Sequence, residues 1–403
     1  MALMRAKDNP SSQTLGGPAT LSIVTPTFNE AGNVVELRDR IARSLEGVRW
    51  ELIVVDDDSP DGSADVVRAM AQQDQRVRCV HRIERRGLAS ACIEGILSSS
   101  APIVAVIDAD LQHDERLLPA MLRALGDDPD LDAVVGSRYA PGGETGEWAA
   151  TRVRQSRLAT ALARRVLRTP LADPMSGFFM MRRHVALDSI REGLSSIGFK
   201  VLFDLLAAAC VPVRCLELPY TFKVREHGES KLDAAVVWDF AIMLLDRFLG
   251  RRLPARFLSF AAVGALGVVT HMVALWATFV VAEVSFPTSQ TIATLVALTG
   301  NFSLHNLFTY RDRRLRGFAL VGGWVTFALA SLLGSLANVG IATHLFASEA
   351  PWAASALAGI AVGTVWNYAL GSAITWRPGR TRTRNGVMMG SGPPRPATAG
   401  RRG

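Results

Sequence analysis

Two carboxylates one residue apart stand where a buried strand is predicted to end. Residues 106–115 read VIDADLQHDE, and an apolar run leads directly into Asp108 and Asp110. Charges this close at the end of a strand repel each other and lose hydration. A divalent cation relieves both effects, and Mg²⁺ or Mn²⁺ suits oxygen ligands. Gln112 can add a neutral oxygen, whereas His113 is a weaker candidate and a solvated turn is the alternative to any metal.

The strands that would position these carboxylates can be followed along the first half of the chain. Residues 21–30 (LSIVTPTFNE) predict a strand stopped by Pro26 and a turn into a helix that starts near Glu30. Residues 51–63 (ELIVVDDDSPDGS) repeat this plan and end their strand in three aspartates, residues 56–58. Strands that alternate with helices form a parallel α/β sheet, whose ligands bind beyond the carboxyl ends of its strands. We therefore expect these polar residues to meet the carboxylate pair at one site, which favours the metal over the turn.

Charged residues are spread unevenly along the 403 residues. They are common up to about residue 250 and nearly vanish between residues 258 and 375, apart from an arginine-rich patch at 311–316. Four apolar stretches fill that half, each about as long as the roughly 20 residues a helix needs to cross a bilayer: 258–282, 287–306, 318–347 and 352–375. Helices buried in a soluble core rarely occur as four uncharged segments in a row. We therefore predict a soluble first half and a membrane half with four transmembrane helices.

The arginines also predict how the membrane half is oriented. They cluster before the first apolar stretch, between the second and third, and after the fourth, while the other two loops carry no Lys or Arg. By the positive-inside rule, both termini and the soluble half face the cytoplasm. The first 17 residues lack the apolar core of a signal peptide and are typical of a disordered tail. The net charge of +7 suits an anionic lipid surface and phosphorylated ligands.

The membrane half contains an internal repeat. NFSLHNLFTYR at residues 301–311 matches NYALGSAITWR at residues 367–377, and both copies end an even-numbered apolar stretch. The repeat predicts two duplicated helical hairpins. Asn301 and Asn367 are costly inside a membrane unless they face protein. Hydrogen bonding between helices explains them better than a transport role.

Seven short motifs resemble a known enzyme family in their order and spacing: PTFNE, VVDDDSPDGS, DADLQHDE, VVGSRY, DPMSGFF, GFK and GESKL. They resemble the family 2 glycosyltransferases of the dolichol- or polyprenol-phosphate mannosyltransferase group, and the membrane half resembles the GtrA-like four-helix domain. The resemblance implies a GT-A fold with a Rossmann-like mixed sheet, then an all-α transmembrane domain of two hairpins. It also implies a sugar nucleotide donor, a divalent metal and inverting transfer to a lipid phosphate. The expected parts are a disordered tail (1–20), the GT-A domain (21–232), juxtamembrane interface helices (233–255), the GtrA-like domain (256–378) and a disordered basic tail (379–403).

The resemblance also implies roles for individual residues. Asp108, Asp110 and Gln112 would coordinate the metal, and Asp110 and Arg138 would act in catalysis. The donor nucleotide would lie against Pro26, Asn29, Glu30, Asp57, Asp108, Arg225 and Lys231. The sugar would lie against Asp173, Ser176 and Gly177, a segment that matches the mannosyl members more than the glucosyl members. A turn or helix-cap role is the alternative for the nucleotide-binding residues, above all for Asn29.

The acceptor phosphate needs cationic side chains and a hydroxyl. Arg138 is expected at a strand end, and Arg152 and Ser156 lie four residues apart, on one face of a predicted helix. The resemblance places the acceptor phosphate on these three residues. A polyprenyl monophosphate has a second pKa of about 6, so it is largely dianionic at neutral pH and needs no general base. The protein then has to hold the phosphate in line and offset its charge.

The expected reaction is transfer of mannose from GDP-mannose to a membrane polyprenyl (dolichyl-type) monophosphate. Alternative donors are UDP-glucose and a UDP-N-acetylhexosamine, and a lipid-linked sugar flippase is the alternative that is not an enzyme. A nucleotidyltransferase would need a glycine-rich basic loop after the first strand, which TPTFNE does not provide. The expected partners are the sugar nucleotide, the lipid phosphate and the membrane, with no nucleic acid. A homo-oligomer is left open.

Overall fold

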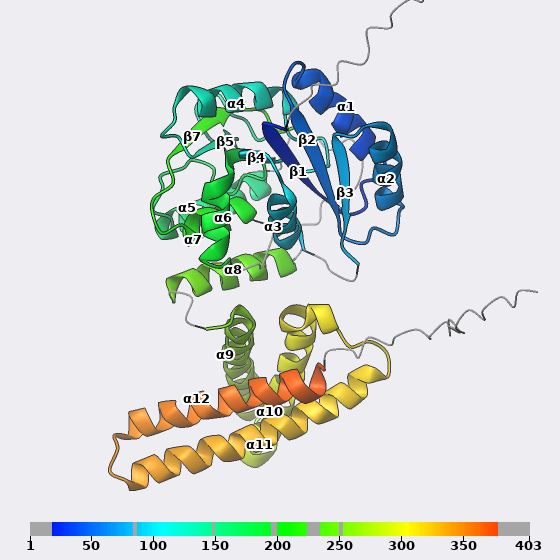
Figure 1. Cartoon of the computed structure of the whole chain (residues 1–403). Coiled ribbons are helices and arrows are strands. Elements are labelled where there is room, and N and C mark those ends of the chain that lie inside the picture. The colour runs from blue at the N-terminus through cyan, green and yellow to red at the C-terminus, as the bar shows by residue number, and fades with distance from the viewer. Residues whose placement is uncertain are drawn as a thin grey trace, which may run out of the picture. The chain divides into compact units, whose positions relative to one another are not determined.

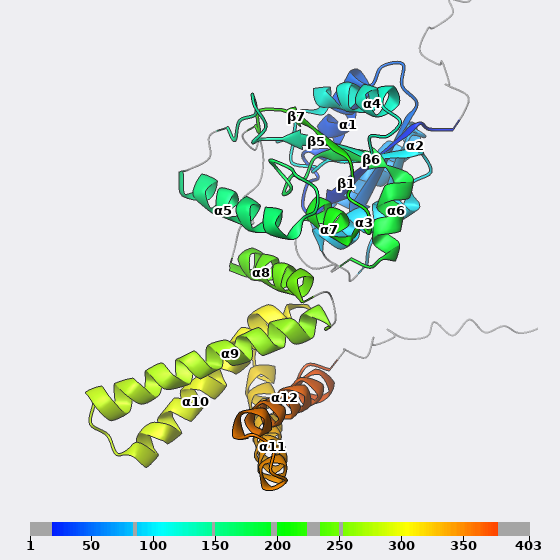
Figure 2. The same cartoon turned by 90° about the vertical axis from the view of Figure 1, so that its left-hand side faces the viewer.

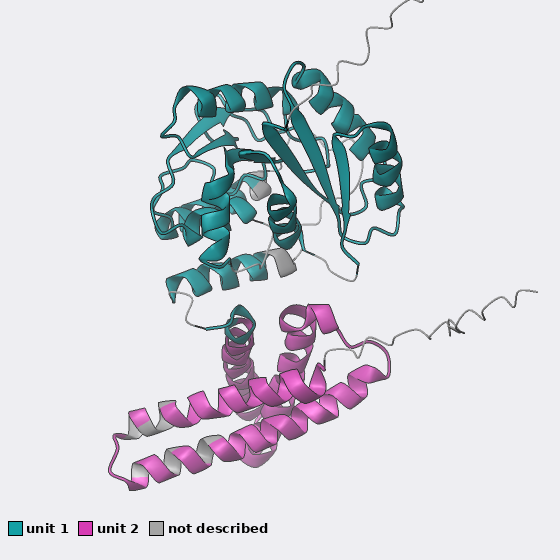
Figure 3. Ribbon diagram, viewed as in Figure 1, with its two compact units in different colours: residues 1–258 teal, residues 259–403 magenta. Residues whose placement is uncertain are grey.

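The computed structural model describes residues 18–83, 87–146, 150–194, 200–223, 234–249 and 253–377. The chain divides into two compact units, Met1–Leu258 and Ser259–Gly403 (Figure 3). Arg225 and Lys231 lie outside the described residues, as do both predicted tails beyond residues 18–20. Arg152 lies on a described helix, but its side chain is outside the description.

In the described part of the first unit, seven strands form one mixed sheet in the order β3-β2-β1-β4-β6-β5-β7 (Figure 1). β6 is antiparallel to both of its neighbours, and the other pairs are parallel. The strands are β1 (Leu21–Thr27), β2 (Trp50–Asp56), β3 (Val77–His81), β4 (Ile103–Val106), β5 (Ala133–Ser137), β6 (Phe179–Arg182) and β7 (Cys215–Pro219).

Helices cover both faces of the sheet and give it two apolar cores. One core joins the sheet to α1 (Val34–Ser44), α2 (Ser63–Gln73) and α4 (Leu118–Asp127). The other core joins it to α3 (Leu88–Ser98), α6 (Arg183–Arg191) and α7 (Val201–Ala208). β1 and β2 are buried along their whole length because both of their faces meet helices, which explains the apolar run at residues 52–55 of β2. Two of their polar side chains satisfy each other, since Ser22 Oγ donates to Glu51 Oε1 (2.6 Å).

Two boundaries at the start of the chain differ from the prediction. β1 is not stopped by Pro26, which pairs with Val55 inside the strand. The pairing of β1 with β4 ends at Val24, so beyond this residue β1 has no neighbouring strand on that side. Proline has no backbone N–H, and at such an edge none is needed. α1 begins at Val34 rather than near Glu30, because the backbone N–H of Glu30 donates to Ser63 Oγ (3.0 Å) and holds a turn.

Two more helices complete the first unit. α8 (Ala234–Phe248) packs Phe240, Met243 and Leu244 against α7 and against α5 (Ala150–Val166). Arg247 of α8 forms a buried ion pair with Asp204 of α7. Both side chains are almost inaccessible, so this pair fixes α8 to the rest of the unit.

Four helices form most of the second unit: α9 (Ala255–Trp276), α10 (Phe286–Leu304), α11 (Ala319–Ala347) and α12 (Trp352–Leu370). α9 and α10 lie side by side in Figure 2, as do α11 and α12 in Figure 1. Among the described residues, Ala255–Val281 and Ala319–Ala337 are long and apolar enough to cross a membrane. The predicted number of four spans therefore stays a prediction.

The two repeated segments have the same local structure. Each continues its helix into a π-helical turn, His305–Thr309 after α10 and Gly371–Thr375 after α12. The next residue is aromatic in both copies, and its N–H donates to the first carbonyl of the turn, at 2.8 Å for Tyr310 and 2.9 Å for Trp376. The two rings stack on each other with centroids 4.2 Å apart and planes 5° apart.

Contacts between the copies are reciprocal. The Tyr310 hydroxyl bonds to Ser372 Oγ (2.7 Å), and Trp376 Nε1 donates to Asn306 Oδ1 (3.2 Å). Ser372 and Asn306 occupy the same place in the two repeats, so each terminal aromatic residue bonds to the equivalent position of the other copy.

Each copy also seats an asparagine against a glycine of the preceding helix. Asn301 lies against Gly267 of α9, and Asn367 lies against Gly334 of α11, so closely that neither glycine has room for a Cβ atom. Both asparagines therefore face protein, but Asn367 Oδ1 has no hydrogen-bond partner among the described residues, so the expected bond between helices is not seen there.

Candidate active site

All the strand ends that carry polar residues meet at one edge of the sheet. β1, β2, β4, β5 and β7 end there, and β6 begins there because it runs in the opposite direction. The residues that follow β4 and β5 and those that precede β6 are therefore neighbours, although they are far apart in sequence. The predicted site residues of the described chain are gathered along this edge or on α5 beside it.

Asp108 lies just beyond β4 and contacts a buried histidine. His113 Nε2 is 3.2 Å from Asp108 Oδ2, and His113 Nδ1 is 2.8 Å from the hydroxyl of Tyr220, which follows β7. Burial raises the pKa of Tyr220 well above its ordinary value, so the phenol keeps its proton and can donate to Nδ1. A carboxylate only accepts, so in a neutral imidazole Nε2 carries the proton toward Asp108. This series of hydrogen bonds from Tyr220 through His113 holds the Asp108 carboxylate in one orientation.

Gly177 approaches the same carboxylate from the start of β6. A Cβ atom at this position would lie 2.7 Å from Asp108 Oδ2, so every other residue would displace the carboxylate. The sequence prediction places Gly177 at the sugar, and the structure gives the glycine a second reason, which is room for Asp108.

Asp110 and Gln112 complete the oxygen-rich segment after β4. Asp110 is buried, and its Oδ1 accepts the backbone N–H of Gln112 (3.2 Å). The Gln112 side chain donates through Nε2 to the Lys223 carbonyl (2.9 Å), so this bond uses the amide nitrogen and not the oxygen that a cation binds.

The oxygen atoms at this edge of the sheet fit a hard divalent cation that takes some of its ligands from the protein and the others from a diphosphate. Within the described ranges, no group of three or more His, Cys, Asp and Glu side chains forms a metal site by itself. Mg²⁺ commonly binds through one or two carboxylates and completes its shell with substrate phosphates and water. Asp108 and Asp110 supply two carboxylates, and about a third of the Asp108 side chain is exposed.

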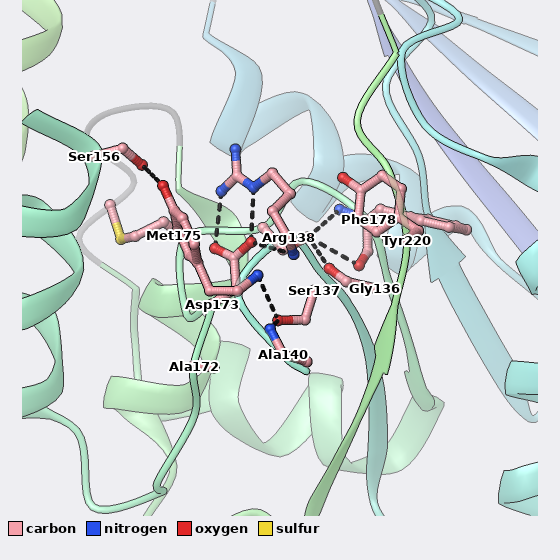
Figure 4. Close-up of polar contacts among 12 residues, drawn as sticks. Gly136, Ser137, Arg138, Ala140, Ser156, Ala172, Asp173, Met175, Phe178 and Tyr220 are labelled. Carbon is pink, nitrogen blue, oxygen red and sulfur yellow. Dashed lines mark hydrogen bonds and ion pairs between the residues drawn. The ribbon is translucent and has the colours of Figure 1, made fainter. Parts of the chain in front are cut away.

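Arg138 and Asp173 form a buried ion pair across the edge (Figure 4). The Arg138 guanidinium donates from Nε to Oδ2 (2.7 Å) and from Nη2 to Oδ1 (2.8 Å), and its backbone N–H also donates to Oδ2 (3.1 Å). Burial by itself would raise the pKa of Asp173, but the hydrogen bonds and charge of Arg138 lower it below its ordinary value. The pair joins a residue predicted for the acceptor to one predicted for the sugar.

Neighbouring groups fix this pair in place. Glu217 of β7 accepts the backbone N–H groups of Ala172 (2.6 Å) and Asp173 (2.8 Å), which holds the turn before β6. The Ser176 hydroxyl donates to the Gly136 carbonyl (2.7 Å) and accepts the Phe178 N–H (3.1 Å). The Ser176 hydroxyl bonds to backbone on both sides, which gives it a structural role beside the predicted sugar contact.

Ser156 faces the site from α5. Its hydroxyl accepts a hydrogen bond from the hydroxyl of Tyr139 (2.7 Å), the residue after Arg138. The face of α5 that carries Ser156 is therefore turned toward the ion pair, and Arg152 is one turn earlier on that helix. Arg154 and Arg157 are exposed.

The edge beyond β1 and β2 holds the residues predicted for the nucleotide. Asp57 accepts hydrogen bonds from Arg82 (2.6 Å) and from the Gly87 N–H (2.6 Å). Burial raises the pKa of Asp57 above its ordinary value, although both donors act against it. Asp56 is turned inward and holds the loop through Ser59.

Asn29 adopts a left-handed conformation (φ 59°), and its N–H donates to Ser59 Oγ (3.0 Å). The side chain of Glu30 bonds to Asn33 (2.6 Å), and Pro26 is buried in β1. These contacts show the turn role that the sequence left as the alternative, and nucleotide binding by these residues stays a prediction.

Several residues of the site were not predicted. Tyr220, Glu217 and Arg82 all act through partners more than 20 residues away, and no local pattern marks such pairs. His113, which lies in the DADLQHDE motif, was predicted as a weaker candidate for the metal. In the structure its ring nitrogens contact Asp108 and Tyr220.

Comparison with known proteins agrees with this geometry. The family described as "Glycosyl transferase family 2" matches residues 22–188, and "GtrA/DPMS, transmembrane domain" matches residues 259–376. A dolichol-phosphate mannosyltransferase of Pyrococcus furiosus is 31% identical over 362 residues, which cover 88% of this chain and 99% of that protein. The chain belongs to glycosyl transferase family 2.

This family 2 glycosyltransferase has further relatives that match a little over half of the chain. A dolichol-phosphate mannosyltransferase of Saccharomyces cerevisiae is 34% identical, with 57% of this chain and 86% of that protein covered. An undecaprenyl-phosphate mannosyltransferase of Micrococcus luteus is 32% identical, with 54% and 90% covered. The predicted resemblance is confirmed: a GT-A-like domain with a mixed sheet precedes a helical GtrA-type membrane domain, and the family 2 glycosyltransferase is a membrane protein.

Proposed function

We propose that this enzyme transfers mannose from GDP-mannose to a polyprenyl (dolichyl-type) monophosphate, with inversion, and forms polyprenyl-phosphate-mannose. The observation that carries the proposal is the single sheet edge on which the Asp108 and Asp110 carboxylates and the buried Arg138–Asp173 pair both lie. The named relatives act on mannose and a lipid phosphate, which supports the choice of both substrates.

On the donor side, Asp108, Asp110 and Gln112 would hold Mg²⁺ or Mn²⁺. When bound, the cation supplies positive charge to the diphosphate that leaves. Pro26, Asn29, Glu30 and Asp57 would line the nucleotide pocket. Arg225 and Lys231, which lie outside the described residues, are proposed to contact the diphosphate.

On the acceptor side, Arg138, Arg152 and Ser156 would hold the lipid phosphate. Asp173 accepts from Arg138 Nε and Nη2, which fixes the plane of the guanidinium, and an arginine side chain has five N–H donors to share. Because the acceptor phosphate is largely dianionic at neutral pH, the chain only has to orient it and offset its charge.

For the whole chain we propose a multi-pass membrane protein with its catalytic domain and both termini in the cytoplasm. The distribution of Arg residues around the apolar stretches supports this orientation.

A panel of radiolabelled sugar nucleotides tests the reaction directly. Purified full-length enzyme should transfer from GDP-mannose to undecaprenyl or dolichyl phosphate, and it should do so far better than from UDP-glucose or UDP-N-acetylglucosamine. Asp108→Asn or Asp110→Asn should abolish transfer while the protein stays folded, since each removes one of two neighbouring charges. Excess EDTA should stop the reaction, and added Mg²⁺ or Mn²⁺ should restore it. Equal transfer from a UDP-sugar, or full activity in EDTA, would contradict the proposal.

A further inference from the structure

A groove of about 460 Å³ opens beside the loop that joins α10 to α11. Its apolar lining includes Phe302, Leu307 and Leu320, and its charged lining consists of Arg314 and Arg316. Both arginines are exposed. Within the described ranges, neither guanidinium has a hydrogen-bond or ion-pair partner, so the groove offers two positive charges to a ligand.

Leu315, the residue between these two arginines, is fixed by contacts to the rest of the second unit. Asn306 is buried and clamps the backbone of Leu315, because its Oδ1 accepts the Leu315 N–H (2.8 Å) and its Nδ2 donates to the Leu315 carbonyl (3.2 Å). The Leu315 side chain fills the space left by Gly323 of α11, where a Cβ atom would overlap it. The two arginines flank this fixed residue and are therefore presented by a rigid segment.

The other charges of the loop have different tasks. Arg313 pairs with Asp312 (3.6 Å) and donates to the Trp376 carbonyl (3.2 Å), which ties the loop to the end of the second repeat. Arg314 and Arg316 have no such contact in the described chain. Arg313 thus has a structural contact, whereas Arg314 and Arg316 face the groove.

A phosphate group fits this combination of charge and shape. The guanidinium fork binds phosphate oxygens with paired hydrogen bonds. The groove lies at the end of apolar helices, and the candidate span Ala319–Ala337 begins three residues after Arg316, at the depth where lipid headgroups lie. Apolar side chains from both α10 and α11 line the groove, which suits a lipid with two chains better than one with a single prenyl chain.

We propose that this groove binds the headgroup phosphate of an anionic glycerophospholipid, with Arg314 and Arg316 on the phosphate and the acyl chains along the apolar walls. The site belongs to the second unit and does not depend on the proposed transfer reaction. It would tie the membrane unit to a particular lipid composition.

Binding of fluorescent phosphatidylglycerol to the purified full-length protein in detergent tests the site. The parent should bind phosphatidylglycerol at least about tenfold more tightly than phosphatidylcholine, because the trimethylammonium cation of phosphatidylcholine offsets its phosphate charge and is repelled by the two arginines. Arg314→Gln/Arg316→Gln should remove most of that difference. The matched control is Arg68→Gln/Arg191→Gln, which removes the same charge from exposed ion pairs of the first unit and should leave lipid binding unchanged.

Two results would overturn the assignment. In the first, Arg314→Gln/Arg316→Gln binds phosphatidylglycerol as tightly as the parent does. In the second, unlabelled undecaprenyl phosphate displaces the labelled lipid more effectively than unlabelled phosphatidylglycerol does, which would make the groove a prenyl-phosphate site.

Discussion

His113 connects Asp108, a carboxylate proposed for the cation, to Tyr220, the residue that follows β7. Since it acts through Asp108, His113→Ala should weaken Mn²⁺ binding and activity by about ten- to a hundredfold, the usual effect of losing such an orienting group. Electron paramagnetic resonance titration of free Mn²⁺, in the presence of GDP, measures this without an activity assay. His113→Gln keeps a side-chain donor and should recover part of the affinity. His184→Ala, at an exposed position of α6, is the control, and unchanged Mn²⁺ binding in His113→Ala would reduce His113 to a packing residue.

The Arg138–Asp173 pair predicts a large effect on stability. Asp173→Asn leaves a buried guanidinium without its counter-charge, and breaking such a pair costs about 3–5 kcal/mol. Denaturant or thermal unfolding should show this loss. Asp188→Asn breaks an exposed pair with Arg191 and should cost less than about 1 kcal/mol. Similar losses of unfolding free energy in the two variants would contradict a stabilising role for the buried Arg138–Asp173 pair.

The same pair predicts the direction of the pH dependence. The folded state lowers the pKa of Asp173 below its ordinary value of 3.8, so folding favours the carboxylate. Its contribution is therefore complete above the unfolded pKa and is lost as the pH falls through the folded pKa. The stability difference between the parent and Asp173→Asn should stay constant from about pH 5 to pH 8 and shrink below about pH 4.

Arg152 is proposed to contact the acceptor and not the donor. Arg152→Ala should raise the acceptor KM or lower kcat, with a loss of roughly 1.5–3 kcal/mol, about ten- to a hundredfold in kcat/KM. Ser156→Ala removes a neutral hydrogen bond and should cost about 1 kcal/mol. Arg154→Ala, exposed on the same helix, is the control. Separate titration of the two substrates measures the acceptor KM and the affinity for GDP-mannose. Weaker GDP-mannose binding with an unchanged acceptor KM would show that this helix contacts the donor.

At the scale of elements, the glycine–asparagine contacts set how closely paired helices approach. Gly334→Ala would overlap Asn367 and should lower stability by about 1–3 kcal/mol. Asn367 Oδ1 is buried without a partner in the described structure, so Asn367→Ala should be nearly neutral and should relieve the overlap in the double variant. Unfolding in detergent with rising SDS measures all three variants. Gly322→Ala, which meets no atom within 4 Å, is the control, and simple additivity would argue against the contact.

The elements also show what the sequence could and could not predict. Strand ends could be read from apolar runs that break at aspartates, and the rule for parallel sheets then placed Asp108 and Asp110 at a common edge. The pairing of Arg138 with Asp173 spans 35 residues and leaves no periodic trace. Pro26 misled the prediction for β1 because its effect depends on where the neighbouring strand ends, which is a tertiary property.

At the scale of the whole molecule, the division into two units predicts separable tasks. A chain that ends after Leu253, before α9 begins, should still transfer mannose to a short-chain polyprenyl phosphate in detergent. It should lose efficiency with long-chain acceptors in membranes, because the second unit is expected to anchor the enzyme and present the acceptor. The full-length enzyme and the shortened chain with Asp108→Asn are the controls. A folded shortened chain that uses no acceptor at all would place the membrane helices in the active site.

The reciprocal contacts of the second unit have an evolutionary consequence. In a symmetric dimer each contact occurs twice, so one substitution changes both sides of the axis at once. Phe260 with Tyr368 and Phe327 with Phe302 are two such equivalent contacts, but here they belong to one chain. Each side can therefore mutate alone, and the sides already differ, with His305 in one repeat where Gly371 stands in the other. Natural selection can thus specialise one half of this unit while the other half preserves the original packing.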